Sequence, residues 1–458
     1  MTSTERLEQT TGPSDSALRV ETNGINVIAE EERRGRPRDL FWPWFGANVS
    51  IFGLSYGAFA LGFGISFWQA VLVGVVGIVF SFLLCGLIAV AGKRGSAPTM
   101  VLSRAAFGVR GNKLPALISW LLTVGWETVL VVLATLATAT VFDRLGWGGG
   151  DATKVVALLV VAALIVAGGV IGFELIMRLQ RFITVVTAVL TVVYFALVAD
   201  EIHWSAVTDL PGGSTQDAVG ALVFLMTGFG LGWVNLAADY SRYLPRRASG
   251  SGIVWWTTFG GFLAPLVLFV LGLAGGAVLD IYSSGLALLS IGLRVPRYVA
   301  ALIDGTIMVI GSIYVVFVAD DFLGQFIGFL VTLGVPVAAW CGVMLADIAL
   351  RRGPYDELDL YRPAGRYGDV RLLPVAVVVG CTIVGWGLVT NAAASWLEWQ
   401  GYLLDAVGLG GKDGAWAGAN LGVLVALVAS FLITLAFTRA SVRRQEAEPP
   451  AAVSEAPA

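Results

Sequence analysis

Long uncharged apolar stretches alternate with short polar or glycine- and proline-rich breaks along most of the chain. Val155–Gly172, Phe182–Ala199 and Leu421–Phe437 contain no charged residue. A bilayer core of about 30 Å needs roughly 20 apolar residues per helical span, so each stretch is long enough to cross it. The stretches do not alternate between polar and apolar residues, as the strands of a membrane β-barrel do. The pattern therefore predicts an all-α integral membrane protein.

The apolar stretches predict ten separate spans and one crowded region. The ten spans are Pro43–Gly64, Phe67–Ala91, Leu114–Phe142, Val155–Phe173, Arg181–Ala199, Ala218–Ala238, Tyr298–Ala319, Phe322–Leu350, Leu372–Thr390 and Trp416–Phe437. The crowded region, Ile253–Leu293, has 41 residues. That length is enough for two minimal spans with almost no loop, or for one span and a surface helix.

The positions of Lys and Arg decide between these two possibilities. With two spans in the crowded region and a cytoplasmic N-terminus, only Arg144, Lys154 and Lys412 fall on the outer side. A single span there would place Arg351, Arg352 and the C-terminal arginines outside. Cytoplasmic loops carry an excess of Lys and Arg. We therefore predict twelve spans in the cell membrane, with both termini cytoplasmic and two spans compressed.

Polar segments precede and follow the predicted spans. We expect residues 1–39 and 439–458 to be disordered cytoplasmic tails because of their polar composition. The opening segment is too hydrophilic for a cleaved signal peptide, so the first span is expected to direct insertion. The basic run Arg33–Arg38 could be a nucleic-acid patch, but Lys and Arg beside a span ordinarily set topology. No nucleic-acid partner is therefore expected.

Composition supports the membrane assignment and argues against an enzyme. Of the residues, 57% are hydrophobic and 13% are charged, whereas a soluble domain carries roughly 25% charged residues. The single histidine, His203, and three cysteines within apolar stretches argue against a metal cluster or a histidine-based triad. No HExxH, GxSxG or phosphate-binding P-loop motif occurs. We expect no catalytic residues, no cofactor and no metal other than Na⁺.

Two predicted spans contain glycine clusters that indicate helix breaks. One is Gly46–Gly57, around Asn48, and the other is Gly228–Gly232. Glycine costs up to about 1 kcal/mol against alanine in a helix interior. In transporters built from inverted repeats, unwound backbone at such breaks binds ions and substrate near the membrane midplane. Close helix packing through small residues is the alternative, but the presence of both clusters, five spans apart, favours breaks.

Charged residues within spans supply candidates for a polar site. Glu127 lies in the middle of Leu114–Phe142, and Asp280 begins a polar run in the crowded region. An intramembrane charge is by default a hypothesis of function. For Glu127 the alternative is a structural hydrogen bond between helices. For Asp304, near the end of its span, that structural role is favoured.

Two tryptophans lie well inside their spans, away from the membrane interface where most of this residue type is expected. They are Trp126, directly before Glu127, and Trp233. Two indole rings offer flat faces that suit a planar ligand between them. Core packing is the alternative.

Several separate motifs resemble those of the nucleobase–cation symporter family, the purine–cytosine permeases. They are the loop Gly95–Asn112, the segments Gly64–Ala70 and Trp233–Pro245, and Ile281–Leu286 followed by Arg294–Arg297. The resemblance runs from about Arg33 to Tyr361. It implies a LeuT-like fold with a 5+5 inverted repeat plus two C-terminal helices. The membrane domain would be residues 40–438, with repeats at about 41–200 and 217–350 and extra helices at about 372–438.

The same resemblance implies a function and a substrate site. The family imports purines, pyrimidines or related heterocycles, driven by Na⁺ or H⁺. Trp126 and Trp233 match its stacking tryptophans, and Asp280 falls near a position where an amide commonly contacts the substrate. Family members can carry a glutamine where this chain has Leu130, and Glu127 is expected to compensate. Asn48 is assigned to the substrate site as well. The expected partners are a nucleobase-like molecule and membrane lipid, with the protein a monomer.

The resemblance also implies an ion site, and here the chain departs from the family. Na⁺ would be bound by backbone carbonyls from Val49 to Phe52 and by the hydroxyls of Ser283 and Ser284. The region between the sixth and ninth spans is shorter than the family pattern, and it should carry part of this site. A non-transporting, ligand-binding paralogue and a passive channel therefore stay open beside the symporter.

Overall fold

The computed structural model describes residues 23–48, 52–171, 209–267, 287–292, 295–318, 322–391 and 395–448, with isolated positions between 182 and 193. Within these ranges, seven helices are long and apolar enough to cross a membrane. The predicted span Arg181–Ala199 and much of the crowded region Ile253–Leu293 lie outside the described residues. The total of twelve spans stays a prediction.

The longer helices follow the predicted spans. They are α1 (Phe41–Asn48), α2 (Phe52–Leu61), α3 (Phe67–Gly95), α6 (Lys113–Arg144), α7 (Asp151–Ile171), α10 (Thr215–Gly228), α13 (Gly250–Val267), α15 (Arg297–Phe317), α16 (Phe322–Leu350), α17 (Leu372–Trp386) and α18 (Leu421–Ala447). The last two helices also differ from the predicted spans, since α17 ends before Thr390 and α18 runs from Leu421 to Ala447. The chain turns back between them, where the Gly401 N–H donates to the Trp386 carbonyl at 2.9 Å.

Capping side chains fix where two central helices begin. The Ser66 hydroxyl accepts a hydrogen bond from the backbone of Gln69, and the Gln69 side chain bonds back to the Ser66 backbone at the start of α3. Ser214 and Asp217 form the same reciprocal pair at the start of α10. Each pair satisfies N–H groups that the first turn of a helix leaves without partners.

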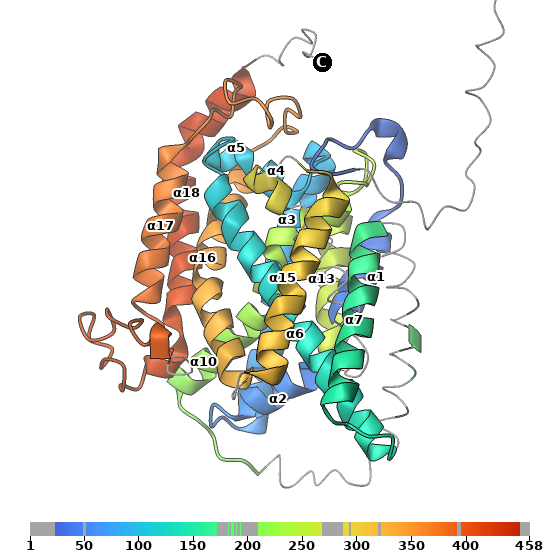
Figure 1. The fold of residues 1–458 in the computed structure, drawn as a ribbon. Helices are drawn as coiled ribbons and strands as arrows, with labels where there is room; N and C mark the ends of the chain where they lie inside the picture. Colours follow the sequence, from blue (N-terminus) through green and yellow to red (C-terminus); the bar gives the residue numbers. More distant parts are fainter. Residues whose placement is uncertain are drawn as a thin grey trace, which may run out of the picture.

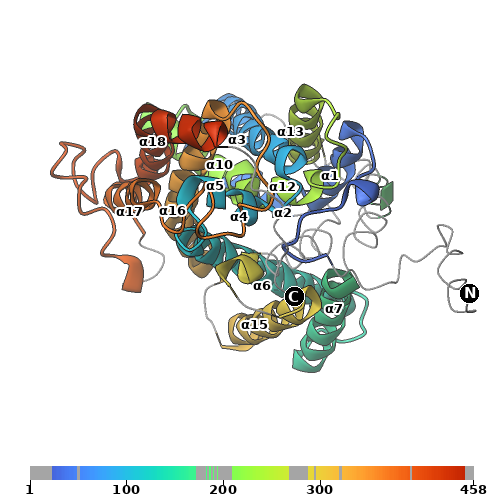
Figure 2. The ribbon, with the colours of Figure 1, turned by 90° about the horizontal axis from the view of Figure 1, so that it is seen from above.

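The helices form two packed groups on either side of a central helix, Thr215–Ser241, that is broken in its middle and begins with α10 (Figures 1 and 2). In one group, α13 packs on α1 and α3, and α10 packs on α3. In the other, α6, α7 and α15 pack on one another. α16 contacts α6, α10 and α3, and it also carries α17 and α18 at one edge of the molecule. The segment Thr215–Ser241 is the most buried of the candidate spans.

The predicted break at Gly228–Gly232 is confirmed. α10 ends at Gly228, and Phe229 leaves the helical region with φ −113° and ψ −110°. The chain continues as α11 (Gly230–Trp233), a 3-10 turn η4 (Val234–Leu236) and α12 (Ala238–Ser241). A Cβ on Gly230 would lie 2.2 Å from the backbone carbon of Ser81, so no side chain fits there. The Gly230 N–H, which the break releases, donates to the Ser81 hydroxyl at 3.1 Å.

The other predicted break, at Gly46–Gly57, is only partly described. α1 ends at Asn48 and α2 begins at Phe52. Residues 49–51 lie outside the described residues. The first span is thus represented by two helical segments, and the break itself stays a prediction.

The described parts of both tails are ordered, which corrects the expectation of disorder for them. Ile28 is 1% exposed, and its N–H donates to the Ser96 carbonyl at 2.9 Å. Arg33 is buried and donates to the carbonyls of Leu244 and Lys93 at 3.0 and 2.8 Å. At the other end, α18 continues to Ala447. Composition missed this order because a few specific contacts, rather than many apolar residues, hold these segments.

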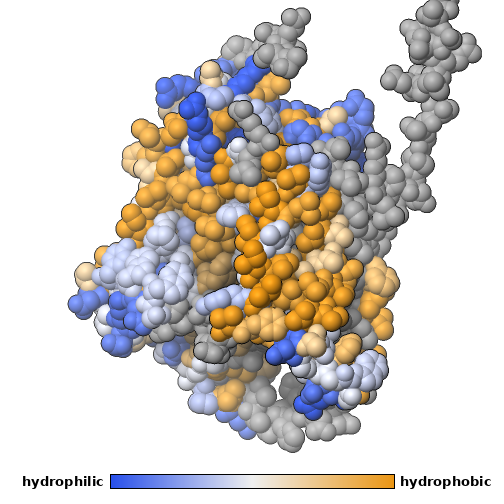
Figure 3. Space-filling view, viewed as in Figure 1, coloured by the Kyte–Doolittle hydropathy of each residue, from blue (hydrophilic) through white to orange (hydrophobic). Residues whose placement is uncertain are grey.

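On the face that Figure 3 shows, apolar residues cover the middle of the molecule and hydrophilic residues gather at its two ends. Many large apolar side chains of the long helices are exposed, among them Val156, Leu164, Ile310 and Phe437. Such a surface is expected where lipid rather than water surrounds the helices.

Candidate functional site

Trp126 lies against the broken helix. It is in the middle of α6, and its ring is 5.3 Å from the ring of Phe326 on α16, at an interplanar angle of 72°. Its indole nitrogen is 3.5 Å from the point where a Cβ on Gly232 would sit. Trp126 therefore packs against the short helix α11 directly after the break, so close that a Cβ at Gly232 would touch the indole.

Trp233, at the end of α11, contacts α1 and α3. Its ring is 5.9 Å from the ring of Trp44 on α1, nearly perpendicular to it at 87°. Its carbonyl accepts a weak hydrogen bond from the Cys85 thiol of α3, with 3.8 Å between sulfur and oxygen. The two predicted tryptophans are thus brought to the same short segment, one against Gly232 and one following it. Both rings are only partly buried.

Glu127 and Asn48 are both buried inside the membrane domain. Glu127 is 0% exposed and follows Trp126 on α6. Leu130, at the position where the family can carry glutamine, is buried in the apolar core. The Asn48 amide donates to the Trp44 carbonyl at 2.8 Å, within its own helix. Asn48 therefore lies one helical turn after Trp44, whose ring contacts the ring of Trp233.

Asn235 is a polar residue of this region that the sequence analysis missed. It lies in the turn η4, is 1% exposed, and its amide nitrogen donates to the Ser119 hydroxyl of α6 at 2.8 Å. Its amide oxygen has no hydrogen-bond partner among the described residues. An unpartnered buried oxygen is costly and is a candidate ligand group. In the sequence, an amide residue within an otherwise apolar run is the signal that could have identified Asn235.

Asp304 has the structural role that the sequence favoured. Its carboxylate accepts a hydrogen bond from the Trp120 indole N–H at 2.8 Å, which joins α15 to α6. Asp304 is completely buried. The pair anchors the helix that carries Trp126.

A cavity of about 360 Å³ reaches the break at Phe229 from the side of α2 and α3. Its lining includes Tyr56 and Gly57 of α2, Ile78 of α3, Leu225 of α10 and Phe229 at the break. The Tyr56 ring lies 4.7 Å from the Phe229 ring. The cavity is mostly apolar and neither Trp126 nor Trp233 lines it, so it does not coincide with the predicted sandwich.

The predicted ion site and one predicted substrate residue fall outside the described residues. These are Asp280, Ser283, Ser284 and Val49. Phe52 is described as the first residue of α2. Within the described ranges, no group of three or more His, Cys, Asp or Glu side chains is placed to hold a metal ion. The roles assigned to these five residues stay predictions.

Two of the motifs that carried the family resemblance meet at one end of the broken helix. Asp239, in α12, accepts hydrogen bonds from the Thr99 backbone N–H at 2.8 Å and from the Thr99 hydroxyl at 2.7 Å. The Ser241 hydroxyl donates to the Ala89 carbonyl of α3 at 2.6 Å. A Cβ on Gly92 would lie 2.1 Å from that hydroxyl oxygen, so α3 needs glycine there. The motifs therefore fix the position of the broken helix.

The ordered N-terminal segment covers this end of the bundle. The Glu30 carboxylate pairs with Arg246 at 3.1 Å, and a hydrogen bond from Arg246 holds the pKa of Glu30 below its ordinary value. Burial lowers the pKa of Arg33. The Tyr361 hydroxyl donates to the Ile25 carbonyl, and burial raises the pKa of this phenol to about 12. The segment thus links the chain after α12 with the loop that follows α16.

Comparison with known proteins gives consistent matches. Residues 27–284, more than half of the chain, match the family described as "Permease for cytosine/purines, uracil, thiamine, allantoin". The purine-cytosine permease FCY2 of Saccharomyces cerevisiae is 25% identical over 260 residues, which are 55% of this chain and 47% of FCY2. The cytosine permease of Escherichia coli strain K12 is 27% identical over 352 residues, 69% of this chain and 75% of that protein. The chain thus spans about half the length of its yeast relative.

Among solved structures, the chain is similar to Mhp1, a nucleobase-cation-symport-1 family transporter in a closed conformation with bromovinylhydantoin bound. The TM-score is 0.69 at 18% identity, and the match covers 92% of this chain and 96% of Mhp1.

Proposed function

Because this chain belongs to the family of permeases for cytosine, purines, uracil, thiamine and allantoin, we propose that it imports a nucleobase or a related heterocycle together with a cation. The fold is the predicted LeuT-like fold of an all-helical membrane protein, as the likeness to Mhp1 shows. The family consists of transporters, not enzymes. The identity of the substrate and the coupling to a cation are our proposal.

The observation that supports the proposal is the position of Trp126 against Gly232 of α11, the short helix directly after the break at Phe229, with Trp233 next to Gly232. We infer that the heterocycle binds between the two indole rings, since aromatic rings stack favourably on planar ligands. Unwound backbone at a helix break offers N–H and C=O groups that the helix no longer uses. The same short segment therefore supplies both a flat surface and polar groups.

Buried polar side chains around this segment would select the substrate. An ionised Glu127 accepts hydrogen bonds from amino or ring N–H groups, which suits cytosine or adenine. The free oxygen of Asn235 has the same preference, since an amide oxygen is an acceptor. Asp280 and Asn48 are proposed as further contacts. Burial of Glu127 makes such a contact worth more than it would be in water.

The coupling cation is proposed to be Na⁺ or H⁺. A Na⁺ ion would be held by carbonyls of residues from Val49 to Phe52 and by the hydroxyls of Ser283 and Ser284. Transport would proceed by alternating access, with the group of α1, α3, α10 and α13 moving against the group of α6, α7 and α15. The count of Lys and Arg supports a cell-membrane protein with both termini cytoplasmic.

Uptake of radiolabelled cytosine and adenine into proteoliposomes tests the substrate class. Unlabelled cytosine, adenine, guanine, uracil and allantoin are added as competitors. We expect saturable uptake that at least one of these bases inhibits. If none of them competes with uptake or binding, the nucleobase assignment is wrong.

A ligand-binding paralogue without transport is the second candidate. The sequence between the sixth and ninth predicted spans, which is shorter than the family pattern, supports it. That reading predicts saturable binding with no accumulation, whereas a passive channel predicts flux that no cation gradient can drive uphill.

A further inference from the structure

A basic pocket lies where α16 and α18 end at the same side of the molecule. It has a volume of about 460 Å³ and is lined by Arg352, Arg439 and Arg443 together with Leu435 and Glu446. Leu435, Arg439 and Arg443 follow one another on α18 at a spacing of four, so they lie on one face of the helix. The pocket is thus built by one stripe of α18 and the end of α16.

Within the described residues, three arginines line this pocket against one carboxylate, that of Glu446, so a net positive charge remains. Both the Arg352 and the Gly353 backbone N–H groups donate to the Glu446 carboxylate, at 2.7 and 2.8 Å. Within the described part of the chain, none of the three lining arginines forms an ion pair with a carboxylate. Like charges at a spacing of four, as in Arg439 and Arg443, repel each other. An anion bound here would relieve that repulsion.

An apolar groove of about 410 Å³ runs on from the pocket along the same two helices. Its walls include Leu84 of α3, Leu345 and Ile348 of α16, and Val428 and Phe431 of α18. Ala349 lines both the groove and the basic pocket. The stripe of α18 that carries the arginines therefore becomes apolar toward the middle of the membrane domain.

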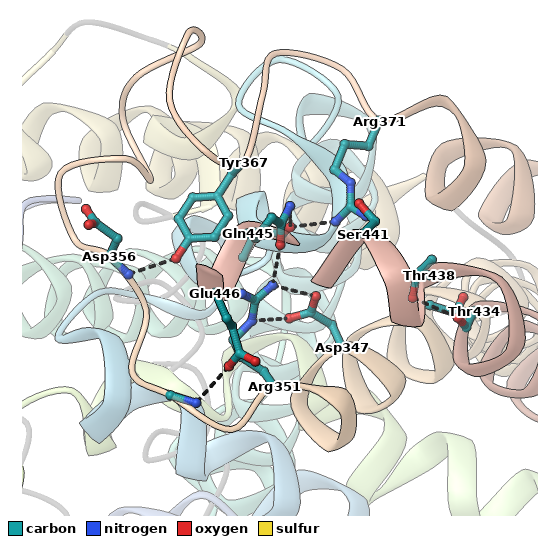
Figure 4. A network of polar contacts seen from close by, with 12 residues as sticks. Asp347, Arg351, Asp356, Tyr367, Arg371, Thr434, Thr438, Ser441, Gln445 and Glu446 are labelled. Carbon is teal, nitrogen blue, oxygen red and sulfur yellow. Dashed lines mark hydrogen bonds and ion pairs between the residues drawn. The ribbon is translucent and has the colours of Figure 1, made fainter. Parts of the chain in front are cut away.

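A polar network joins the end of α16 to α18 next to this pocket, and Glu446 belongs to both (Figure 4). Arg351 pairs with Asp347 at 2.8 Å and donates to the Gln445 amide oxygen of α18 at 2.9 Å. Arg371 donates to the Ser441 hydroxyl at 2.8 Å. Arg351 and Asp347 are buried. The arginines of the pocket are not needed for this network, so the surface is preformed and its charge is available to a ligand.

We propose that this surface binds one anionic glycerophospholipid, with its phosphate at the three arginines and an acyl chain in the groove. Guanidinium groups bind phosphate oxygens through paired N–H donors. Basic pockets between membrane helices at the cytoplasmic side recognise anionic headgroups, and the Lys and Arg count predicts this end to be cytoplasmic. A free phosphate ion would use the pocket but not the groove, whereas a lipid uses both.

Thermal melting of the purified full-length protein in a neutral detergent tests the proposal. Intrinsic fluorescence reports the melting, since the chain has 15 tryptophans. Phosphatidylglycerol, phosphatidylcholine with the same acyl chains, and inorganic phosphate are added separately. We expect a saturable rise in Tm with phosphatidylglycerol and no comparable rise with the other two. An equal effect of phosphatidylcholine, or a full effect of inorganic phosphate, would overturn the lipid assignment.

Variants locate the site. The double variant Arg439→Gln, Arg443→Gln should raise the half-saturating phosphatidylglycerol concentration about tenfold, because two charge-assisted contacts are lost. The matched control, Arg247→Gln with Arg444→Gln, removes the same charge from the same end of the molecule but outside the pocket. It should change the half-saturating phosphatidylglycerol concentration little. Ala349→Phe should block the junction of groove and pocket without removing charge. An unchanged concentration in Arg439→Gln, Arg443→Gln and in Ala349→Phe, or an equal loss in the control, would refute the site.

Discussion

The indole nitrogen of Trp126 lies 3.5 Å from the position that a Cβ on Gly232 would take. The middle of α6 therefore packs against α11, the short helix that directly follows the break at Phe229. It places an indole ring close to the break, where the backbone leaves the helical conformation at Phe229. The proposed transport site depends on this relationship, and the following predictions test the parts that maintain it.

Gly230→Ala should disrupt the break. The new Cβ would lie 2.2 Å from the backbone carbon of Ser81, so α3 and α11 would have to separate. We expect a clear fall in Tm, of the size caused by overpacking at roughly 1–3 kcal/mol, and loss of uptake. The matched control is Gly57→Ala in α2, whose Cβ would meet nothing within 4 Å. Equal melting curves for the Gly230 variant and the wild type would contradict this packing.

Asn235→Ala should weaken substrate binding more than it weakens folding. The amide oxygen is buried and has no partner among the described residues, whereas the amide nitrogen bonds to Ser119. Losing one acceptor for a substrate N–H should raise KM about tenfold. Ser119→Ala removes the internal bond alone and serves as the control. A fall in Tm without a change in KM would assign Asn235 a purely structural role.

Asp239→Ala should destabilise the end of the broken helix. It removes the acceptor of both hydrogen bonds from Thr99, one of them from a buried backbone N–H. Leaving such donors unpaired costs about 1–3 kcal/mol each. Asp239→Asn keeps one side-chain oxygen and should retain much of the stability. Thermal melting compares the two, and equal losses in both variants would argue that charge rather than acceptor geometry matters.

Arg33→Ala should release the ordered N-terminal segment. The buried guanidinium donates to the carbonyls of Leu244 and Lys93, which would lose these partners. Hydrogen exchange should then become faster at the Ile28 N–H, which is bonded to the Ser96 carbonyl. The exposed Arg38 provides a control, since Arg38→Ala should leave that exchange rate unchanged. Protection at Ile28 that survives Arg33→Ala would mean that other contacts hold the segment.

The sequence predicted the membrane helices well because hydrophobic stretches have a direct physical meaning in a bilayer. Phe67 was placed correctly as the first residue of its span, where Ser66 caps α3. The break near Gly230 was predicted from glycine alone, because glycine is costly inside a helix unless something requires it. The structure supplies that requirement in the backbone of Ser81.

Other features could not be predicted because they depend on long-range contacts. The order of residues 23–39 rests on partners such as Leu244, which are distant in sequence. Asn235 looked like any polar residue until its buried position and its Ser119 partner were known. The basic pocket required α16 and α18 to end side by side. Charge patterning along α18 alone indicated only topology.

Gradient-driven accumulation of a labelled nucleobase tests the central claim most directly. Proteoliposomes are loaded so that an inward Na⁺ gradient, an inward H⁺ gradient or no gradient is imposed, with choline replacing Na⁺ and with two pH values. We predict accumulation above the external concentration with one of the gradients only, and its loss in Trp126→Ala. Flux that merely equilibrates under every condition, or full accumulation in Trp126→Ala, would contradict the account.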